Sequence, residues 1–147
     1  PIFYYSPFRP EVYADQLANA KPGFEIAVNV SMKITDDIDA ALYGTKASLA
    51  FYIGGMGAKG QNYHTKLMAR MGFEEEAYKI QDLFFENKRD EAIAMVPTDF
   101  ADEISLVGPV ERIRDRLQAW EESPVTMLNV VAHTPEEMRL LADVVKG

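Results

Sequence analysis

The stretch VTMLNVVAHTPEEM, residues 125–138, contains the two signals that decide the fold. Residues 125–131 form a nearly continuous apolar run, which is typical of a parallel strand that is buried on both faces. Thr134 then suits an N-cap, Pro135 the first helical position, and Glu137 the capping-box position of a helix. A strand that leads directly into a helix predicts an α/β arrangement. Three apolar side chains of this helix are expected to face inward: Met138, Leu141 and Val145.

A second strand followed by a helix is predicted earlier in the chain. Residues 24–30 alternate apolar residues with polar or small ones, and residues 31–34 extend the pattern. Residues 35–37, Thr-Asp-Asp, then supply an N-cap and an acidic first turn for a helix over 36–53. The expected buried positions of that helix are Ile38, Ala41, Leu42, Leu49 and Tyr52.

The remaining segments show mostly helical spacing. Residues 105–109, Ser-Leu-Val-Gly-Pro, are predicted as a turn, with Pro109 at the first position of a new helix whose buried stripe is Ile113, Leu117 and Trp120. No repeat, low-complexity segment or linker interrupts the chain, so we expect one compact unit over residues 1–147. The other helices are predicted over residues 10–20, 62–71, 74–86, 89–95 and 98–102.

Composition excludes several classes of function. The 147 residues include 15 Lys and Arg against 23 Asp and Glu, and the resulting net charge of −8 argues against nucleic acid as the main partner. The chain has no cysteine, which excludes disulfides, thiol catalysis and cysteine-ligated metals. Two distant histidines and scattered carboxylates do not form a metal-ligand spacing. No apolar run is long enough for a membrane span, and we expect a cytoplasmic protein.

Two architectures are compatible with so few strands. One is a small α/β domain with a helical insert, and the other is the C-terminal part of a (β/α)₈ barrel, which needs about 250 residues when complete. The chain begins at Pro1 and opens with the apolar aromatic run of residues 1–5. This start favours the barrel interpretation, because natural termini are usually polar and frayed.

Several motifs carry a resemblance to a known family. The main ones are the run LAFYIGGMG at residues 49–57 and the triplet Asn-Tyr-His at 62–64. Residues 80–84, 92–97, 102–109 and 125–131 agree with the same pattern. Together they resemble the luciferase-like monooxygenase superfamily, and within it the deazaflavin-dependent (coenzyme F-420) oxidoreductase branch.

The resemblance implies a (β/α)₈ barrel of about twice this length, with the cofactor ring at the C-terminal ends of the strands. It makes residues 24–30 the seventh strand and residues 125–131 the eighth, so this chain would be the C-terminal part of the barrel, completed by a missing N-terminal half. The implied reaction is hydride transfer between the deazaflavin C5 and a substrate carbon. Two alternatives remain: an FMN-dependent monooxygenase of the same fold, and an inactive fragment that self-associates through open strand edges.

The glycine-rich stretch at residues 54–60 is the first candidate site. Glycines let a backbone approach a ligand closely, and the resemblance places this segment near the mouth of the active site. We predict that Gly54, Gly55, Met56, Gly57, Lys59 and Asn62 bind the cofactor, with Lys59 meeting a phosphate or carboxylate. The alternatives are a hinge between two helices, a solvated lysine, and a helix N-cap at Asn62.

His64 is the predicted catalytic residue, because imidazole can donate a proton or clamp a polar group near neutral pH. Its alternative is a structural histidine with ordinary hydrogen bonds. Asn29 and Ser31 end the first strand, and they are expected on the catalytic face together with residues 4–6. His133 follows the last strand and more simply starts the last helix. Arg112 and Arg116 are expected on a solvated helix surface.

Overall fold

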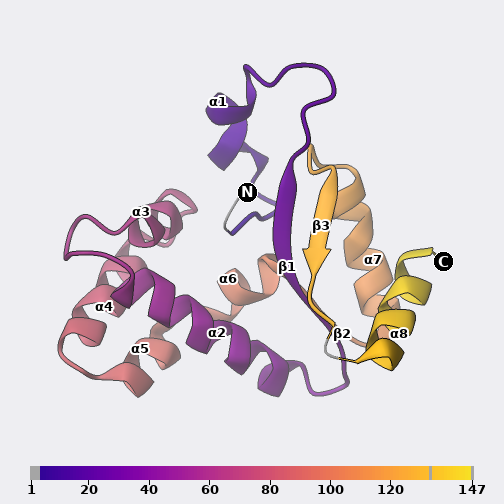
Figure 1. The fold of residues 1–147 in the computed structure, drawn as a ribbon. Coiled ribbons are helices and arrows are strands. Elements are labelled where there is room, and N and C mark those ends of the chain that lie inside the picture. Colours follow the sequence, from indigo (N-terminus) through magenta and orange to yellow (C-terminus); the bar gives the residue numbers. More distant parts are fainter. Residues whose placement is uncertain (1–3, 133, 147) are drawn as a thin grey trace. The chain divides into compact units, whose positions relative to one another are not determined.

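A three-stranded parallel sheet organises the first of two compact units of the chain (Figure 1). The computed structural model describes residues 4–132 and 134–146. The strands are β1 (Ala27–Ile34), β2 (Ser105–Gly108) and β3 (Met127–Val130), in the spatial order β2-β1-β3. This first unit comprises residues 1–41 and 103–147, and the second comprises residues 42–102.

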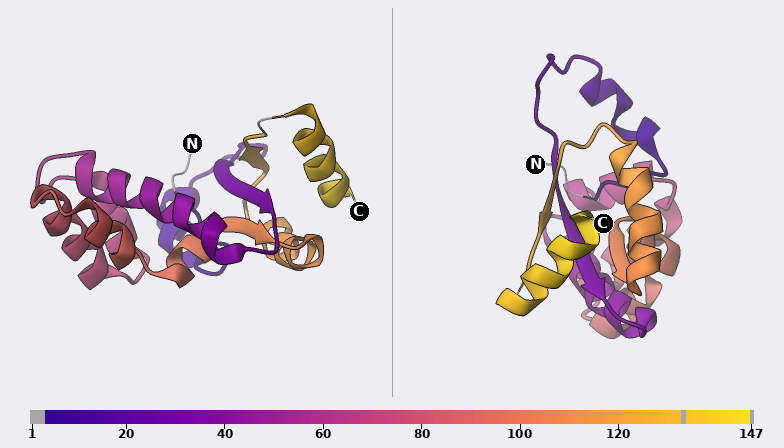
Figure 2. Two further views of the ribbon diagram at one scale, coloured as in Figure 1. Left: turned by 90° about the horizontal axis from the view of Figure 1, so that it is seen from below. Right: turned by 90° about the vertical axis from the view of Figure 1, so that its right-hand side faces the viewer.

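Helices fill most of the remaining chain. The short turns η1 (Pro10–Tyr13) and α1 (Ala14–Leu17) precede the sheet, and α2 (Ile38–Gly55) leads from the first unit into the second. α7 (Val110–Glu121) follows β2 and α8 (Pro135–Lys146) follows β3, and these two helices contact each other (Figure 2). The helices between α2 and β2 are α3 (Tyr63–Arg70), α4 (Glu74–Phe85), α5 (Arg89–Met95) and α6 (Thr98–Glu103).

Most of the predicted elements are confirmed. β1 starts three residues later than the alternation indicated and extends to Ile34, because its polar positions continue to alternate with buried ones. Gly72 ends α3 at a φ of +92° and donates to the Ala69 carbonyl, as a C′ glycine does. Thr134 caps α8 by accepting from the Glu137 amide at 3.1 Å. The expectation of one compact unit differs from the two units observed, which are interleaved along the chain.

The predicted turn at residues 105–109 is wrong. Residues 105–108 form β2, all four are buried, and Ser31–Ile34 pairs with them in parallel. Four consecutive buried residues give no alternation for a pattern search to detect. Pro109 is the N-cap of α7 rather than its first helical residue, although the predicted stripe of Ile113, Leu117 and Trp120 is indeed buried.

Two burial predictions near the C-terminus are also wrong. β3 is not buried on both faces, because Met127 is 45% exposed, and only β1 pairs with it among the described residues. On α8, Leu141 and Val144 are buried, whereas Met138 and Val145 are 62% and 55% exposed. Part of the apolar surface of β3 and α8 is therefore left uncovered by the described residues.

The two arginines that were expected in solvent pack against the fold. Arg112 donates to the carbonyl of Val107 at the end of β2, and the guanidinium of Arg116 lies 5.3 Å from the centre of the Phe8 ring. Gly108 has a φ of +135°, and a Cβ at this position would lie 2.8 Å from Cδ of Arg112. The prediction of a solvated helix surface is wrong because the spacing of the two arginines along the helix does not determine their tertiary contacts.

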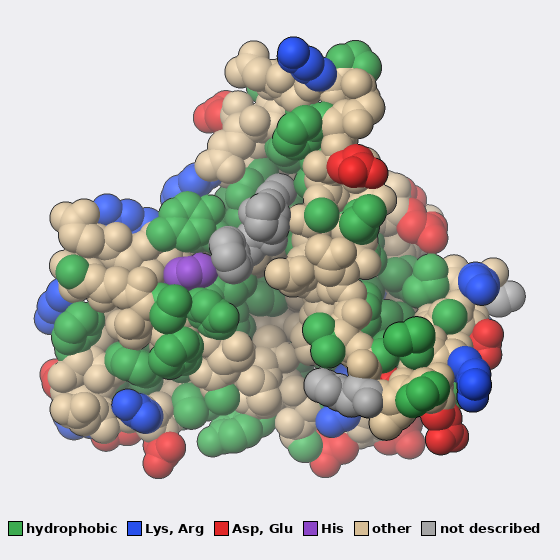
Figure 3. Space-filling model, in the orientation of Figure 1, with side chains coloured by type: hydrophobic (Ala, Val, Ile, Leu, Met, Phe, Trp, Pro, Cys, Tyr) green, Lys and Arg blue, Asp and Glu red, His purple; other side chains and the backbone are tan. Residues whose placement is uncertain are grey.

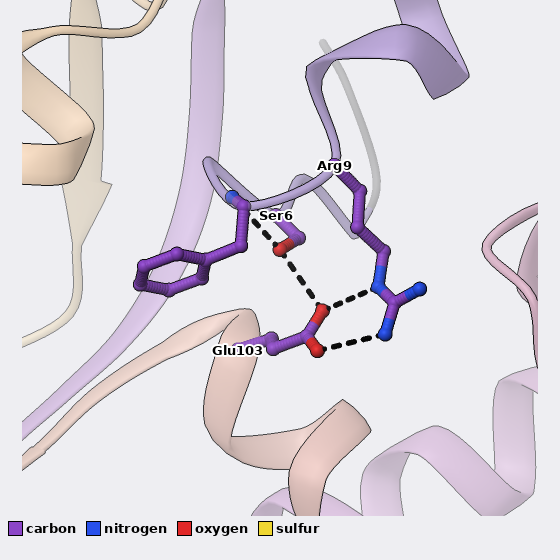
Figure 4. A network of polar contacts seen from close by, with 4 residues as sticks. Ser6, Arg9 and Glu103 are labelled. Carbon is purple, nitrogen blue, oxygen red and sulfur yellow. Dashed lines mark hydrogen bonds and ion pairs between the residues drawn. The ribbon is translucent and has the colours of Figure 1, made fainter.

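The N-terminal segment is held to Glu103, the last residue of α6, by a cluster of polar contacts (Figure 4). Arg9 binds Glu103 through two parallel hydrogen bonds, from Nε at 2.7 Å and from Nη2 at 2.9 Å. Ser6 also donates to Glu103, at 3.0 Å, and accepts from the Phe8 amide. Tyr5 beside them is buried against the Trp120 ring, so neither Tyr5 nor Ser6 lines the open face of the sheet.

We expect the Arg9–Glu103 pair to couple more strongly than an exposed ion pair of the same protein. Its side chains are only 32% and 19% exposed, and a double-mutant cycle of Arg9→Gln and Glu103→Gln should give about 1–2 kcal/mol. The Lys59–Asp82 pair, with side chains 65% and 45% exposed, should give at most about 0.5 kcal/mol. Urea unfolding measures both energies, and equal values for the two pairs would contradict the prediction.

Candidate functional site

One face of the sheet in the first unit is polar and open. Along β1, Val28, Val30 and Met32 are buried, and the alternate side chains of Asn29, Ser31 and Lys33 are exposed. The parallel register sets Asn129 of β3 directly opposite Asn29, and its Nδ2 donates to Oδ1 of Asn29 at 3.3 Å. Hydrogen-bonding groups from two strands therefore share this face.

A cavity of about 560 Å³ lies over this face. Besides both strands, its lining includes Val131, which follows β3, and Glu137 of α8. The volume falls in the range of pockets that hold small molecules or cofactors. The cavity combines apolar walls with an ammonium group, a carboxylate, a hydroxyl and two amides, which suits a small ligand with both apolar and hydrogen-bonding groups.

The sequence predicted Asn29 and Ser31 for this face but missed Lys33, Asn129 and Glu137. The period of two along β1 already assigns Lys33 to the same face as Asn29. Asn129 and Glu137 could not be found this way, because their place depends on the register between the strands and on the course of α8. His133, the other candidate near the strand ends, lies outside the described residues.

The structure places the first two glycines of the 54–60 stretch in a helix, which corrects the prediction of a continuous loop. Gly54 and Gly55 form the end of α2, where the Phe84 side chain of α4 lies against them. A Cβ on Gly54 would lie 2.5 Å from Cβ of Phe84, and one on Gly55 would lie 2.6 Å from Cε1. The absence of side chains here allows an aromatic ring to approach the helix backbone closely.

Buried polar side chains hold the loop that follows. Asn62 is 1% exposed, caps α3 by accepting from the His64 amide at 2.8 Å, and donates to the carbonyls of Tyr52 and Ile53. Thr65 donates to the same Ile53 carbonyl at 2.6 Å. Asn62 thus joins the end of α2 to the start of α3, which matches the N-cap alternative.

Gln81 is a site residue that the sequence analysis missed. It is 2% exposed, accepts from the Gly60 amide at 3.0 Å, and donates to Thr65 Oγ1 at 3.1 Å. Its neighbour Asp82 forms an ion pair with Lys59 at 2.5 Å. Consecutive residues of α4 therefore hold consecutive residues of the loop, while Met56 remains 51% exposed.

His64 lies in the first turn of α3 and is 9% exposed. The centres of the Tyr52 and Tyr63 rings lie 5.1 Å and 5.5 Å from its own. Burial lowers the pKa of His64 below its ordinary value of 6.5, so the imidazole is neutral at pH 7. A neutral imidazole offers one donor and one acceptor, but it is a weak proton source at that pH.

The candidate residues thus fall into two groups. Asn29, Ser31, Lys33 and Asn129 share the open sheet face of the first unit, and the residues from Gly54 to His64 lie in the second unit. The part of the chain that the structure describes contains no cluster of three potential metal ligands. None of its helices combines the length and the apolar character of a membrane span.

Comparison with known proteins identifies the family. The model of a family described as luciferase-like monooxygenase matches residues 8–127, which include β1, β2 and the whole second unit. The chain belongs to the luciferase-like monooxygenase family. The resemblance inferred from the motifs is therefore confirmed.

Two relatives of this luciferase-like chain bear the name of the same coenzyme. A Mycobacterium tuberculosis protein named as a coenzyme F-420-dependent oxidoreductase is 37% identical over 154 aligned positions, covering 99% of this chain and 44% of its own length. The solved coenzyme F-420-dependent tetrahydromethanopterin reductase of Methanopyrus kandleri matches with a TM-score of 0.58 and 21% identity, over 90% of this chain and 36% of its own. The chain spans less than half the length of both proteins, and the 37% identity to the first supports the coenzyme F-420 branch, whereas the second match shows the fold alone.

The contact between Gly54 and Phe84 predicts opposite effects for two glycine substitutions in α2. Gly54→Ala should lower the free energy of unfolding by about 1–3 kcal/mol, because the new methyl group overlaps Cβ of Phe84. Gly44→Ala is the matched control, since no atom lies within 4 Å of its added Cβ, and it should raise stability by about 0.5–1 kcal/mol. Equal effects in thermal or urea unfolding would contradict the close approach seen here.

Burial of His64 predicts a particular pH dependence of stability. The unfolded chain binds a proton near pH 6.5, whereas the folded chain binds it only at lower pH, so stability should fall as the pH drops below 6.5 towards the folded pKa. His64→Gln should lack this part of the slope. An NMR titration, with the two imidazoles distinguished by a His133→Gln variant, measures the pKa directly. A pKa of His64 at or above 6.5 would contradict the prediction.

Proposed function

We propose that this chain supplies part of a coenzyme F-420-dependent oxidoreductase, which transfers hydride between the deazaflavin and an organic substrate. The observation that carries the proposal is the 37% identity to a protein with that name, which extends over nearly all of the chain. The parallel sheet with an open polar face is compatible with it. No specific feature of the chain favours an FMN-dependent monooxygenase instead.

The proposed architecture is a (β/α)₈ barrel in which β1 and β3 are the seventh and eighth strands. Three observations support it: the two strands are parallel neighbours, a helix follows β3, and the fold resembles that of a solved F-420-dependent reductase. β2 pairs with Ser31–Ile34 only, so the other half of this edge of β1, residues 27–30, has no partner among the described strands. A sixth strand could pair there.

Exposed apolar side chains support a partner for β3 and α8. Met127 and Val131 in and after the strand, and Met138 and Val145 on the helix, are all at least 45% exposed. Figure 3 shows hydrophobic side chains at the surface of the region that Figure 1 labels α8. We propose that the rest of the barrel covers them, although a second copy of this chain would bury the same surface.

The open sheet face fits the deazaflavin ring by its chemistry. When bound, this coenzyme supplies the hydride chemistry at its C5. Asn29 and Asn129 would hold the polar edge of the ring, and Val131 would keep water from one side of it. Lys33 and Glu137 line the same cavity and would orient a substrate of opposite charge at their respective ends.

Taken by itself, the loop of the second unit is a separate proposed contact for an anionic group such as those of the coenzyme. Gly60 has open space around its α-carbon. Lys59 pairs with Asp82, but its side chain is 65% exposed, so an anionic group of the ligand would have to share or replace that ion pair. Gly54 and Gly55 would contribute indirectly, by positioning Phe84, because that side chain fills the space beside them. Gly57 and Asn62 would set the course of the loop, and His64, being neutral, would serve as a polar clamp for the ligand.

Binding of coenzyme F-420 tests this proposal. We expect Lys59→Ala to weaken binding about tenfold, because it removes one charge-assisted contact. Lys66→Ala on α3 is the matched control and should bind like the unchanged protein. The titration uses the purified protein with all co-purifying chains retained, and native mass spectrometry records the complex.

Three outcomes would contradict all or part of the proposal. Absence of coenzyme binding by the retained complex would refute the assignment to an F-420-dependent enzyme. Equal binding by the Lys59→Ala and Lys66→Ala variants would refute the role of the loop while leaving the assignment in place. Replacement of the deazaflavin by FMN in the bound species, visible in its mass and absorption spectrum, would favour the monooxygenase.

A further inference from the structure

A second cleft lies in the helical unit, apart from the glycine loop. It has a volume of about 180 Å³ and is lined by Ala47, Ala50 and Phe51 of α2, Phe84 of α4, and Arg89 and Ile93 of α5. All of these residues belong to the second unit. The cleft is apolar except for one guanidinium group.

Phe84 forms a fixed wall of this cleft. One side of its side chain rests against Gly54 and Gly55, which have no Cβ to displace it. The Phe51 ring meets it edge-on at 6.2 Å between ring centres, and the Arg89 guanidinium lies 5.6 Å from the centre of its ring. These contacts restrain the ring, so the shape of the cleft exists before any ligand arrives.

The charge of Arg89 is available at the rim. Neighbouring Glu86 is occupied by Lys88 at 2.8 Å, and that pairing lowers the pKa of Glu86 and raises the pKa of Lys88. Among residues 4–132 and 134–146, no carboxylate forms an ion pair with Arg89. A guanidinium that stacks on an aromatic ring keeps its planar fork free for a carboxylate.

We propose that this cleft binds a small carboxylic acid with a flat apolar body, such as an aromatic acid. An apolar cavity of about 150 Å³ is large enough for benzene, so a cleft of about 180 Å³ accommodates one six-membered ring. The ring would lie between Phe51, Phe84 and Ile93, and its carboxylate would accept two hydrogen bonds from Arg89. This site goes beyond the proposed oxidoreductase function, because it needs neither the coenzyme nor the sheet.

Benzoate is the probe, and NMR of the 147-residue protein without coenzyme is the measurement. We expect amide signals of Ala50 and Ile93 to shift with a dissociation constant in the low millimolar range, as befits a ligand of about nine non-hydrogen atoms. Benzamide has the same shape and size but no charge, and it should bind about tenfold more weakly. Equal binding of the two compounds would refute the role assigned to Arg89.

Two variants test the lining of the cleft. Arg89→Gln should weaken benzoate about tenfold and leave benzamide unchanged, whereas Lys88→Gln, which alters the neighbouring cation, should change neither by more than about twofold. Ala47→Leu should abolish binding of both by filling the cleft. No benzoate shift in the unchanged protein, or full benzoate affinity in either Arg89→Gln or Ala47→Leu, would overturn the proposal. Coenzyme binding is measured separately, so this result does not depend on the oxidoreductase assignment.

Discussion

Parallel pairing of β1 on both of its edges is the constraint on which the rest of the structure depends. The C-terminal half of the strand pairs with β2 and the N-terminal half pairs with β3. Parallel neighbours cannot be joined by a tight turn, so each pairing requires a crossover. Residues 35–104 join β1 to its neighbour β2 and contain the whole helical unit, and the connection that contains α7 then leads from β2 past β1 to β3. The interleaved order of the two units along the chain follows from this topology.

The same pairing creates the open polar face. A strand that is buried on one side places every second residue on the other, so Asn29, Ser31 and Lys33 need no special turn or strain to be displayed together. Parallel register then adds Asn129 without an offset. Apolar residues at these four positions would make the face a packing surface. Polar side chains at these positions give up apolar burial and offer directional hydrogen bonds instead, which is the composition expected of a sheet face that water or a ligand covers rather than a helix.

Local signals could be predicted from the sequence, whereas long-range placements could not. The Thr134 cap, the Gly72 helix end and the alternation along β1 each depend on a few neighbouring residues, and all three are confirmed. β2 was missed because a four-residue strand has no local signature, and its existence depends on β1 being available beside it. Gln81 was missed for the same reason, since its side chain bonds Gly60 from a helix that is distant in sequence.

The glycine stretch shows why a motif and its physical role must be argued separately. In the sequence, the residues from Gly54 to Gly60 resemble one ligand-binding loop, yet in the structure the stretch divides into two parts with different requirements. Gly54 and Gly55 are helical, and the lack of a side chain there leaves room for Phe84. Gly60 has open space around it and a φ of +76°, which glycine adopts without strain. A side chain at the first pair would displace an aromatic ring, whereas one at Gly60 would strain only the loop. The first two glycines of the motif are therefore explained by the packing of Phe84 from α4 against α2, without any contact with a coenzyme.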